Sequence, residues 1–436
     1  MKNICLYFRV HQPSFLKSFR FFNIGSDETY FDDIAISTNM QKLANKCYLP
    51  ANKILLEQIK KTDGKFKVAF SISGVTIDQF EKYTPSVLES FKELAQTGCV
   101  EFLAQSFSNS LASLGARSEF EFQIARQLKK YDQHFNTSPK AFVNTELIYS
   151  NEIGKTVSDL GFNTVLTEGA DHILGYRSPN YLYTNPSAPK QKVLMRNYKL
   201  SDDIAYRFSK KDWHSWPLTA EKYCSWITAL PKDENFVNIF MDYETFGEHH
   251  WIESGIFDFL AALGETALNT GKLGFATPSE IAKNNKAADS VNIPHPISWS
   301  DEERDLTAWL GNELQRDTFN LLYKLAPTVA KINEHEITNE YLHLQSADHF
   351  YYMSTKMFSQ GAYRAQTTPY DSPYTAYINY MNVLNDFIIK IGYKENKNAL
   401  INELNDTIEE RNRLITVLEK DIDFLQRKLS KKRIKR

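Results

Sequence analysis

The chain has 436 residues, of which 42% are hydrophobic and 24% charged, and its formal net charge at pH 7 is −2. This ordinary globular mixture excludes a largely disordered chain, and the balanced charge excludes a nucleic-acid-binding protein that works through an overall basic field. The length predicts two or three domains with enough apolar material for a large core. Aromatic residues reach 13%, which is typical either of a large core or of a cleft for sugars or aromatic ligands.

The cysteines and the apolar runs indicate where such a chain would reside. Its four cysteines are scattered singly, without a CxxC pair. This spacing favours neither a disulfide framework nor a zinc ribbon, and it suits a reducing compartment. The first apolar run is interrupted by Arg9 and His11, too early for the core of a signal peptide. No run reaches the roughly 20 apolar residues of a membrane span, so we expect a cytoplasmic protein without one.

Seven short runs rich in β-branched and aromatic residues alternate with amphipathic helical patterns along the first two thirds of the chain. The runs are Ile4–Val10, Phe66–Ile72, Val100–Ala104, Ala141–Asn144, Thr164–Thr167, Phe236–Met241 and Gly274–Ala276. Such alternation predicts βα units and a parallel sheet. Seven units are too many for a small doubly wound sheet. We therefore predict an α/β fold, with an incomplete TIM-like (β/α)7 barrel over residues 1–285.

Three further segments depart from the βα rhythm. Residues 170–223 are rich in Asn, Ser, Pro and Tyr, and are predicted to form a long insertion with little regular structure that shapes the ligand site. Residues 286–393 show only helical periodicity, which predicts a helical domain that completes the cleft. Residues 394–436 carry a heptad pattern and end in a basic tip, which predicts a coiled-coil helix. Self-association into a homo-oligomer is the expected consequence, and a single solvated helix on the bundle is the alternative.

Acidic residues follow several of the predicted strands. Glu146, Glu168, Asp242 and Glu244 stand just after three of the seven runs, and His11 follows the first. The carboxyl ends of parallel barrel strands meet at one mouth, so these side chains are expected to lie together. Paired acids at such a mouth indicate glycoside hydrolysis, metal binding or proton abstraction, and spacing alone does not choose among them.

Motifs for metals and nucleotides are absent from the sequence. It contains no HExxH, no HxH and no two-histidine, one-carboxylate spacing, and neither a P-loop nor GxGxxG. We therefore expect no metal site, no cofactor and no nucleotide chemistry.

Several phrases together carry a resemblance to a known family. The phrase Met-Asp-Tyr-Glu-Thr-Phe-Gly-Glu-His around Asp242 stands in order with His11-Gln12-Pro13, with Thr145-Glu146-Leu147 and with the stretch 299–315. From residue 1 to about residue 390, the chain resembles glycoside hydrolase family 57, and within it the α-amylase branch. The resemblance implies an incomplete barrel of seven βα units followed by a helical region, and a retaining reaction on α-1,4-glucans or maltooligosaccharides.

The resemblance also implies roles for individual residues. Glu146 would be the nucleophile and Asp242 the general acid/base. A retaining enzyme needs one ionised carboxylate beside the anomeric carbon and a second that holds a proton for the leaving oxygen, with the two about 5–5.5 Å apart. Negative charge on Glu146 or Glu244 would favour the proton on Asp242. His11 is expected to bind a sugar hydroxyl or to hold a catalytic carboxylate.

Other residues of these motifs are predicted to bind substrate. Gln12 and Glu244 belong to the two motifs just described. Trp299 and Trp309 are expected to offer stacking faces for glucose rings, with Asp301 supporting that wall, although core packing competes for Trp309. Trp251 follows the acid/base motif closely and is expected in the cleft. No role is predicted for Trp213, Trp216 and Trp226.

The chain departs from the family pattern at three positions. Gln105 stands where an acid is usual, Asn109 where a histidine is usual, and Arg9 where a glutamine is expected. Both catalytic carboxylates are present, so we expect a glycoside hydrolase. The alternatives are a 4-α-glucanotransferase and a catalytically impaired protein that binds glucan or acts as a scaffold.

Overall fold

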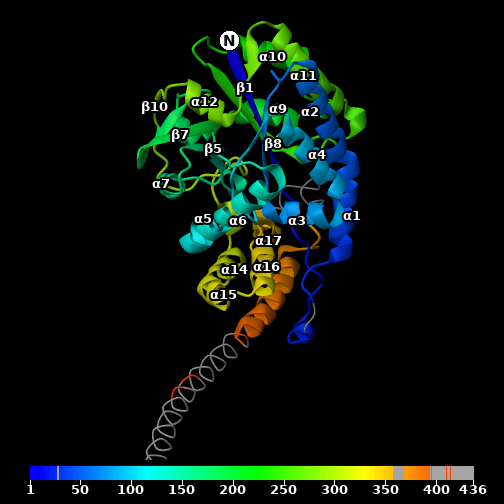
Figure 1. Cartoon of the computed structure of the whole chain (residues 1–436), viewed down its shortest axis with the longest axis vertical. Coiled ribbons are helices and arrows are strands. Elements are labelled where there is room, and N and C mark those ends of the chain that lie inside the picture. The colour runs from blue at the N-terminus through cyan, green and yellow to red at the C-terminus, as the bar shows by residue number, and fades with distance from the viewer. Residues whose placement is uncertain (27–28, 357–367, 393, 395–408, 410–412, 414–436) are drawn as a thin grey trace, which may run out of the picture.

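The computed structural model describes residues 1–26, 29–356 and 368–392, together with residues 394, 409 and 413. An α/β part forms the upper body of the molecule in Figure 1, and helices of the C-terminal third lie below it. The predicted coiled coil with its basic tip lies outside the described residues, apart from single positions, so it stays a prediction.

The first sheet is built around the N-terminal strand. It holds β1 (Lys2–Val10), β2 (Val68–Ile72), β3 (Val100–Phe102) and β8 (Phe236–Asp242) in the order β3-β2-β1-β8, and β9 (Leu273–Phe275) pairs with the start of β1. All its strands are parallel. Their side chains are mostly buried, because helices cover a parallel sheet on both faces. The pairing of β1 with β8 sets Arg9 directly beside Asp242.

The second sheet runs in the order β10-β6-β7-β5-β4. Its strands are β4 (Ala141–Val143), β5 (Thr164–Glu168), β6 (Tyr183–Asn185), β7 (Ala188–Arg196) and β10 (Asp289–Ser290). A parallel bridge between Ala104 and Phe142 joins the two sheets on one side. On the other side, Asn197 N donates to Asn238 O at 2.9 Å. These links bring the carboxyl ends of β1, β4, β5, β7 and β8 to a common edge.

The seven predicted strands are all present, and the α/β fold is confirmed. The seven-unit barrel stays a prediction, because the strands are described as two sheets. The expectation of little regular structure in 170–223 is wrong. That segment contains β6, the nine-residue β7 and two short helices. The sequence does not predict β7 because its apolar run is only three residues long, from Val193 to Met195, between the polar residues Lys192 and Arg196.

Helices of the α/β part pack over both sheets, as the labels of Figure 1 show. They are α1 (Asp33–Leu43), α2 (Leu49–Lys61), α3 (Gly74–Tyr83), α4 (Pro85–Gln96), α5 (Ala112–Gly115), α6 (Arg117–Phe135), α7 (Asn151–Asp159), α8 (Asp171–Leu174), α9 (Tyr198–Ala205), α10 (Ala220–Ala229), α11 (Ile256–Asn269) and α12 (Pro278–Asn284). Several of them begin at a capping side chain. Ser73 and Asn197 directly follow a strand and cap α3 and α9, and Ser150 caps α7. These caps satisfy free backbone N–H groups at the start of each helix.

From Thr307 onward the described regular elements are helices. They are α13 (Thr307–Leu310), α14 (Glu313–Lys324), α15 (Ala326–Ile332), α16 (His335–Leu344), α17 (Ala347–Tyr352) and the helical residues 373–392. Their apolar side chains share one core with the second sheet. Residues 289–297 still pair with the α/β part, through β10 and a bridge from Ile297 to Tyr149. The helical region thus packs directly against the sheet.

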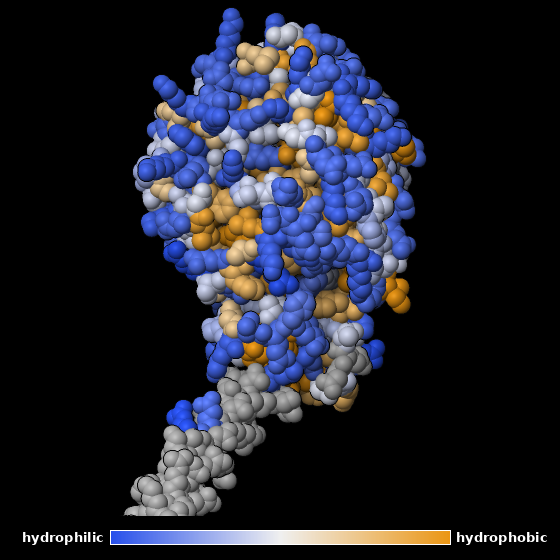
Figure 2. Space-filling model, viewed as in Figure 1, coloured by the Kyte–Doolittle hydropathy of each residue, from blue (hydrophilic) through white to orange (hydrophobic). Residues whose placement is uncertain are grey.

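The surface is dominated by polar residues. Figure 2 shows hydrophilic side chains over most of the visible face, with hydrophobic ones in small groups. Among the helices described, none combines the length and the apolar character needed to cross a bilayer.

Candidate active site

Arg9 lies between the two predicted catalytic carboxylates. Its Nε is 2.6 Å from Asp242 Oδ1, and its Nη1 donates to Glu146 Oε1. Burial opposes the charge of this guanidinium, yet Asp242 and Glu146 raise the pKa of Arg9 well above its usual range. Arg9 is therefore a permanent cation that joins the end of β1 to the ends of β4 and β8. Glu146 and Asp242 lie at the same site, as predicted. Arg9 connects them, and the sequence did not predict this contact.

Glu146 occupies a strained turn directly after β4. It lies in the 3₁₀ turn Thr145–Leu147 with φ = 53°, and Leu147 follows with φ = 55°. Two successive non-glycine residues in the left-handed region cost free energy, and such strain concentrates at functional sites. Three donors hold the carboxylate: Arg9, Asn109 Nδ2 at 3.2 Å and Trp299 Nε1 at 2.7 Å. Glu146 is only 9% exposed, so this cage determines its orientation.

Two of the three residues that depart from the family pattern, Arg9 and Asn109, contact Glu146. Asn109 has φ = 49° and supplies one of the three donors. Gln105 is buried, and its Nε2 has no hydrogen-bond partner among the described residues; the same is true of Asn109 Oδ1. Buried polar atoms are rarely left unpaired in folded proteins, so these two atoms are exceptions among the described residues.

Glu244 is a further buried carboxylate of the site, and its partners are an amide and a phenol. Gln12 Nε2 donates to Glu244 Oε1 at 2.9 Å, and the Tyr48 hydroxyl donates to the same oxygen. Burial, and next the charge of Asp242, raise the pKa of Glu244 to about 7. Burial and the charge of Asp242 thus both favour the protonated form of Glu244. Tyr48 comes from the short π-helix Ala44–Tyr48, and no sequence pattern points to it.

His11 connects the site to the helical region. Its Nδ1 is 2.7 Å from Ser73 Oγ, and its Nε2 is 2.9 Å from Asp348 Oδ2 on α17. Ser346 Oγ also donates to Asp348. Burial acts against ionisation of Asp348, but the contact with His11 outweighs it and holds the pKa of that carboxyl well below its usual range. The carboxylate that His11 contacts is thus Asp348, which the sequence did not single out.

The predicted aromatic residues divide among three environments. Trp299 donates to Glu146, and the guanidinium groups of Arg9 and Arg196 lie over its ring at 4.9 and 5.5 Å. Its faces thus engage in cation–π contacts rather than offering a bare stacking surface. Trp309 is 3% exposed inside the core shared with Tyr351. Its ring presents no face to a sugar, which corrects the expected stacking role in favour of core packing.

Trp251 and Asp301 lie outside the carboxylate clusters. Trp251 is 67% exposed. Asp301 adopts φ = 55° in the turn after Trp299, which places it in the loop that carries the tryptophan.

A buried ion-pair network packs against Trp299 through Arg196. Arg196 and Glu168 occupy paired positions at the ends of β7 and β5, with 3.0 Å between Nη1 and Oε2. Arg196 also contacts Asp202 at 2.5 Å, and Arg304 lies 3.5 Å from Glu168. Each buried charge has an opposite partner, as the cost of desolvation requires. Glu168 therefore reaches the mouth as predicted, but as part of the frame that orients Trp299.

The donor set of the site is suited to protonation chemistry. Within the described ranges, no three or more His, Cys, Asp or Glu side chains are grouped so as to hold a metal ion. The side chains that converge are carboxylates, amides and guanidinium groups, which bind hydroxyl groups and move protons.

The sequence and the fold are both similar to those of known carbohydrate-active proteins. Residues 5–294 match the model of glycosyl hydrolase family 57. A protein of Methanocaldococcus jannaschii named "Putative alpha-amylase" is 41% identical over 398 residues, which cover 88% of this chain and 84% of that protein. An α-amylase of Pyrococcus abyssi is 24% identical over 208 residues, 47% of this chain and 29% of that protein.

Solved structures show the same fold at low identity. A branching enzyme of Pyrococcus horikoshii superposes with a TM-score of 0.64 at 13% identity, over 88% of each chain. A 4-α-glucanotransferase of Thermococcus litoralis gives a TM-score of 0.61 at 18% identity, over 80% of this chain and 56% of that chain. The match to the family model and the long, 41% identical relative together place this chain in glycosyl hydrolase family 57.

Proposed function

We propose that this chain is a retaining glycoside hydrolase of the α-amylase type, acting on α-1,4-glucans with Glu146 as nucleophile and Asp242 as general acid/base. The observation that carries the proposal is the convergence of these two carboxylates on one guanidinium, that of Arg9. A retaining reaction needs two carboxyl groups about 5–5.5 Å apart, and a shared guanidinium supports the proposal because it keeps Glu146 and Asp242 near each other. Membership of the family and the name of the M. jannaschii relative support the same substrate class.

In the first step, a Glu146 oxygen attacks the anomeric carbon while Asp242 gives a proton to the glycosidic oxygen. The bond between that carbon and that oxygen breaks, the shortened chain leaves with the proton, and a glycosyl ester of Glu146 forms. The hydrogen bonds from Trp299 and Asn109 hold Glu146 for this attack. Pre-orientation of this kind lowers the entropic part of the barrier.

In the second step, water attacks the same carbon and Asp242 accepts its proton. The ester bond breaks, and the sugar leaves with its original anomeric configuration. Ester formation has removed the charge of Glu146, so the guanidinium of Arg9 then faces Asp242 alone and holds its carboxylate in place.

Product analysis with maltoheptaose tests the proposal. Shorter sugars should appear with the parent and be lost in Glu146→Gln and Asp242→Asn, while Glu152→Gln, a change of an exposed acid on α7, should behave like the parent. A fluorinated glucosyl donor should label Glu146, because it slows the second step more than the first. A label on another carboxylate would refute the nucleophile assignment.

A 4-α-glucanotransferase is the second candidate. The T. litoralis protein of that name shares the fold, and the two reactions differ only in whether water or a sugar hydroxyl attacks the glycosyl ester. Sugars longer than maltoheptaose, appearing beside shorter ones, would identify transfer.

A protein that binds glucan without turnover is the third candidate, and the position of Arg9 favours it. One cation contacts both carboxylates, so it occupies oxygens that a nucleophile and a general acid would present to the substrate. Sugar binding that persists in Glu146→Gln, with no product from the folded parent, would support this reading.

A further inference from the structure

A pocket of about 660 Å³ lies outside the candidate active site, between α9, α10 and the connecting residues 206–219. We call these connecting residues the α9–α10 loop. Arg207, Trp213 and His214 come from the loop, Trp226 from α10 and Asp203 from α9. The volume falls within the range of small-molecule sites. None of these residues takes part in the contacts of Glu146 or Asp242, so the pocket is a separate feature.

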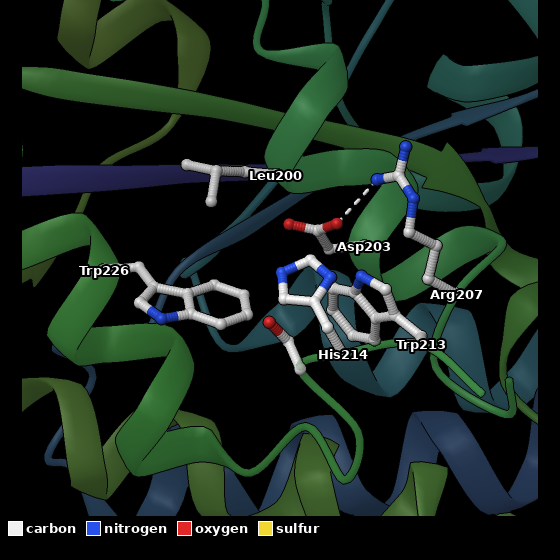
Figure 3. Close-up of a pocket in the computed structure, with 7 residues that line it drawn as sticks. Leu200, Asp203, Arg207, Trp213, His214 and Trp226 are labelled. Atoms are coloured by element: carbon white, nitrogen blue, oxygen red, sulfur yellow. Dashed lines mark hydrogen bonds and ion pairs between the residues drawn. The ribbon is translucent and has the colours of Figure 1, made fainter. Parts of the chain in front are cut away.

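Two tryptophans give the pocket its apolar walls. The rings of Trp213 and Trp226 meet edge to face, with centroids 6.1 Å apart and an interplanar angle of 79°. Figure 3 shows Trp226, His214 and Asp203 turned toward the same space, with Trp213 beside them. Both indoles are only partly buried. They therefore keep apolar surface that a ligand can cover.

The polar groups of the pocket balance in charge. Arg207 Nη1 lies 2.6 Å from Asp203 Oδ1, one turn earlier. The pair offers planar donors and acceptors, and the exposed His214 adds a ring nitrogen. Because the pair sums to zero charge, it gives the pocket no net attraction for a phosphate or a cation. A neutral ligand with many hydroxyl groups suits these groups better.

The pocket is pre-formed by hydrogen bonds from α10. Lys222 Nζ donates to Ser215 O at 3.0 Å and to Pro217 O at 2.9 Å, and the Tyr223 hydroxyl donates to Leu200 O at 3.1 Å. The Lys222 bonds hold the loop against α10, and the Tyr223 bond joins α10 to α9. Ligand binding then requires little ordering of the chain, which favours affinity.

Helix α9 connects the pocket to the active site. Asp202 contacts Arg196 in the frame behind Trp299, whereas the next residue, Asp203, faces the pocket. At the far end of α9, His250 from the loop after β8 lies 2.9 Å from Ile204 O and 2.7 Å from Ser209 Oγ. Helix α9 thus contacts both the pocket and the ion-pair network next to Trp299.

We propose that this pocket is a second carbohydrate-binding site, which holds a short stretch of neutral sugar chain outside the cleft. The apolar C–H face of a pyranose ring covers an indole, and the hydroxyl groups at its edge bind the Asp203–Arg207 pair and His214. That the bound sugar is an α-1,4-glucan rests on the proposed function. A site beside the cleft increases the local concentration of a polymeric substrate, as linked binding sites do.

Fluorine NMR of the Glu146→Gln chain labelled with 5-fluorotryptophan tests this site directly. The chain has six tryptophans, so the resonances of Trp213 and Trp226 can be assigned with phenylalanine variants, and that of Trp299 reports on the cleft. Titration with maltoheptaose should shift the Trp213 and Trp226 resonances with a dissociation constant of their own. His214→Ala combined with Asp203→Asn should weaken that response about tenfold, the equivalent of about 1.4 kcal/mol, and leave the Trp299 response unchanged.

Trp216→Ala is the matched control, because Trp216 is an exposed tryptophan of the same loop that does not line this pocket. It should leave both responses unchanged. The proposal is overturned if Trp213 and Trp226 stay silent when Trp299 is saturated, or if the double variant titrates like its parent. A Trp226 response without any Trp299 response would instead leave the pocket standing and remove support for the proposed function. Silence of all three resonances would overturn the pocket as a sugar site.

Discussion

Arg9 and Asp242 stand side by side at the ends of two paired strands, with 2.6 Å between Nε and Oδ1. The same guanidinium reaches Glu146, so the charge of one residue acts on both carboxylates that we propose as catalytic. This relationship distinguishes the site from a simple pair of acids, and its effect on the reaction can be measured.

Replacing Arg9 should change the pH dependence of turnover. Without the cation, two carboxylates face each other and retain a shared proton to higher pH. We expect Arg9→Gln to extend activity on maltoheptaose toward alkaline pH by about one unit or more, measured as the basic limb of kcat against pH. Arg9→Lys keeps the charge and should follow the parent more closely. An unchanged basic limb in Arg9→Gln would show that Arg9 does not govern protonation.

Glu244 should make the protein less stable as the pH rises. Its folded-state pKa of about 7 lies above the ordinary value of 4.5, so between these values the folded chain binds more protons than the unfolded chain. The free energy of unfolding should therefore decrease across that window, by about 3 kcal/mol, and level off above pH 7 or so. Glu244→Gln should abolish this decrease, as measured by urea unfolding at several pH values. Glu248→Gln is the control, since Glu248 pairs with Lys42 at the surface, and it should retain the decrease.

Asp348 should anchor the helical region to the end of β1. Asp348→Asn removes the charge that faces His11 and should lower the free energy of unfolding at neutral pH by about 1–3 kcal/mol. Since the pKa of Asp348 is lowered on folding, this contribution is complete above about pH 4 and is lost as the pH falls further. Asp33→Asn affects an exposed pair with Lys82 and should cost about 1 kcal/mol or less. Equal losses in the two variants would contradict the anchoring role.

Replacing Trp299 should lower turnover, whereas replacing Trp309 should lower the stability of the fold. Trp299→Phe retains a ring but loses the hydrogen bond to Glu146, and we expect kcat to fall about tenfold, the equivalent of about 1.4 kcal/mol. Trp309→Phe leaves a space in the core and should lower the free energy of unfolding by about 1–3 kcal/mol without changing KM. A raised KM in Trp309→Phe would restore its expected role as a sugar platform.

The strands and the gathering of acids could be predicted from the sequence because they depend on short stretches of chain. A buried parallel strand must be apolar on both faces, and this marks β1, β2 and β8 without knowledge of their neighbours. Parallel strands end at one edge, so Glu146 and Asp242 were expected together. Strand β7 was missed because its buried positions carry a glutamine and an arginine whose partners lie on other elements.

The sequence by itself determined the family, the seven strands and the pair of carboxylates, since local apolar patterns and motifs encode them. Only the tertiary structure decided which groups surround that pair. The contact of Arg9 with Asp242 depends on the register between strands 233 residues apart, and that of His11 with Asp348 spans 337 residues. The pocket of Trp213 and Trp226 likewise exists only where α9, α10 and their loop fold together. Contacts of this kind follow from packing in three dimensions, which no short stretch of residues specifies.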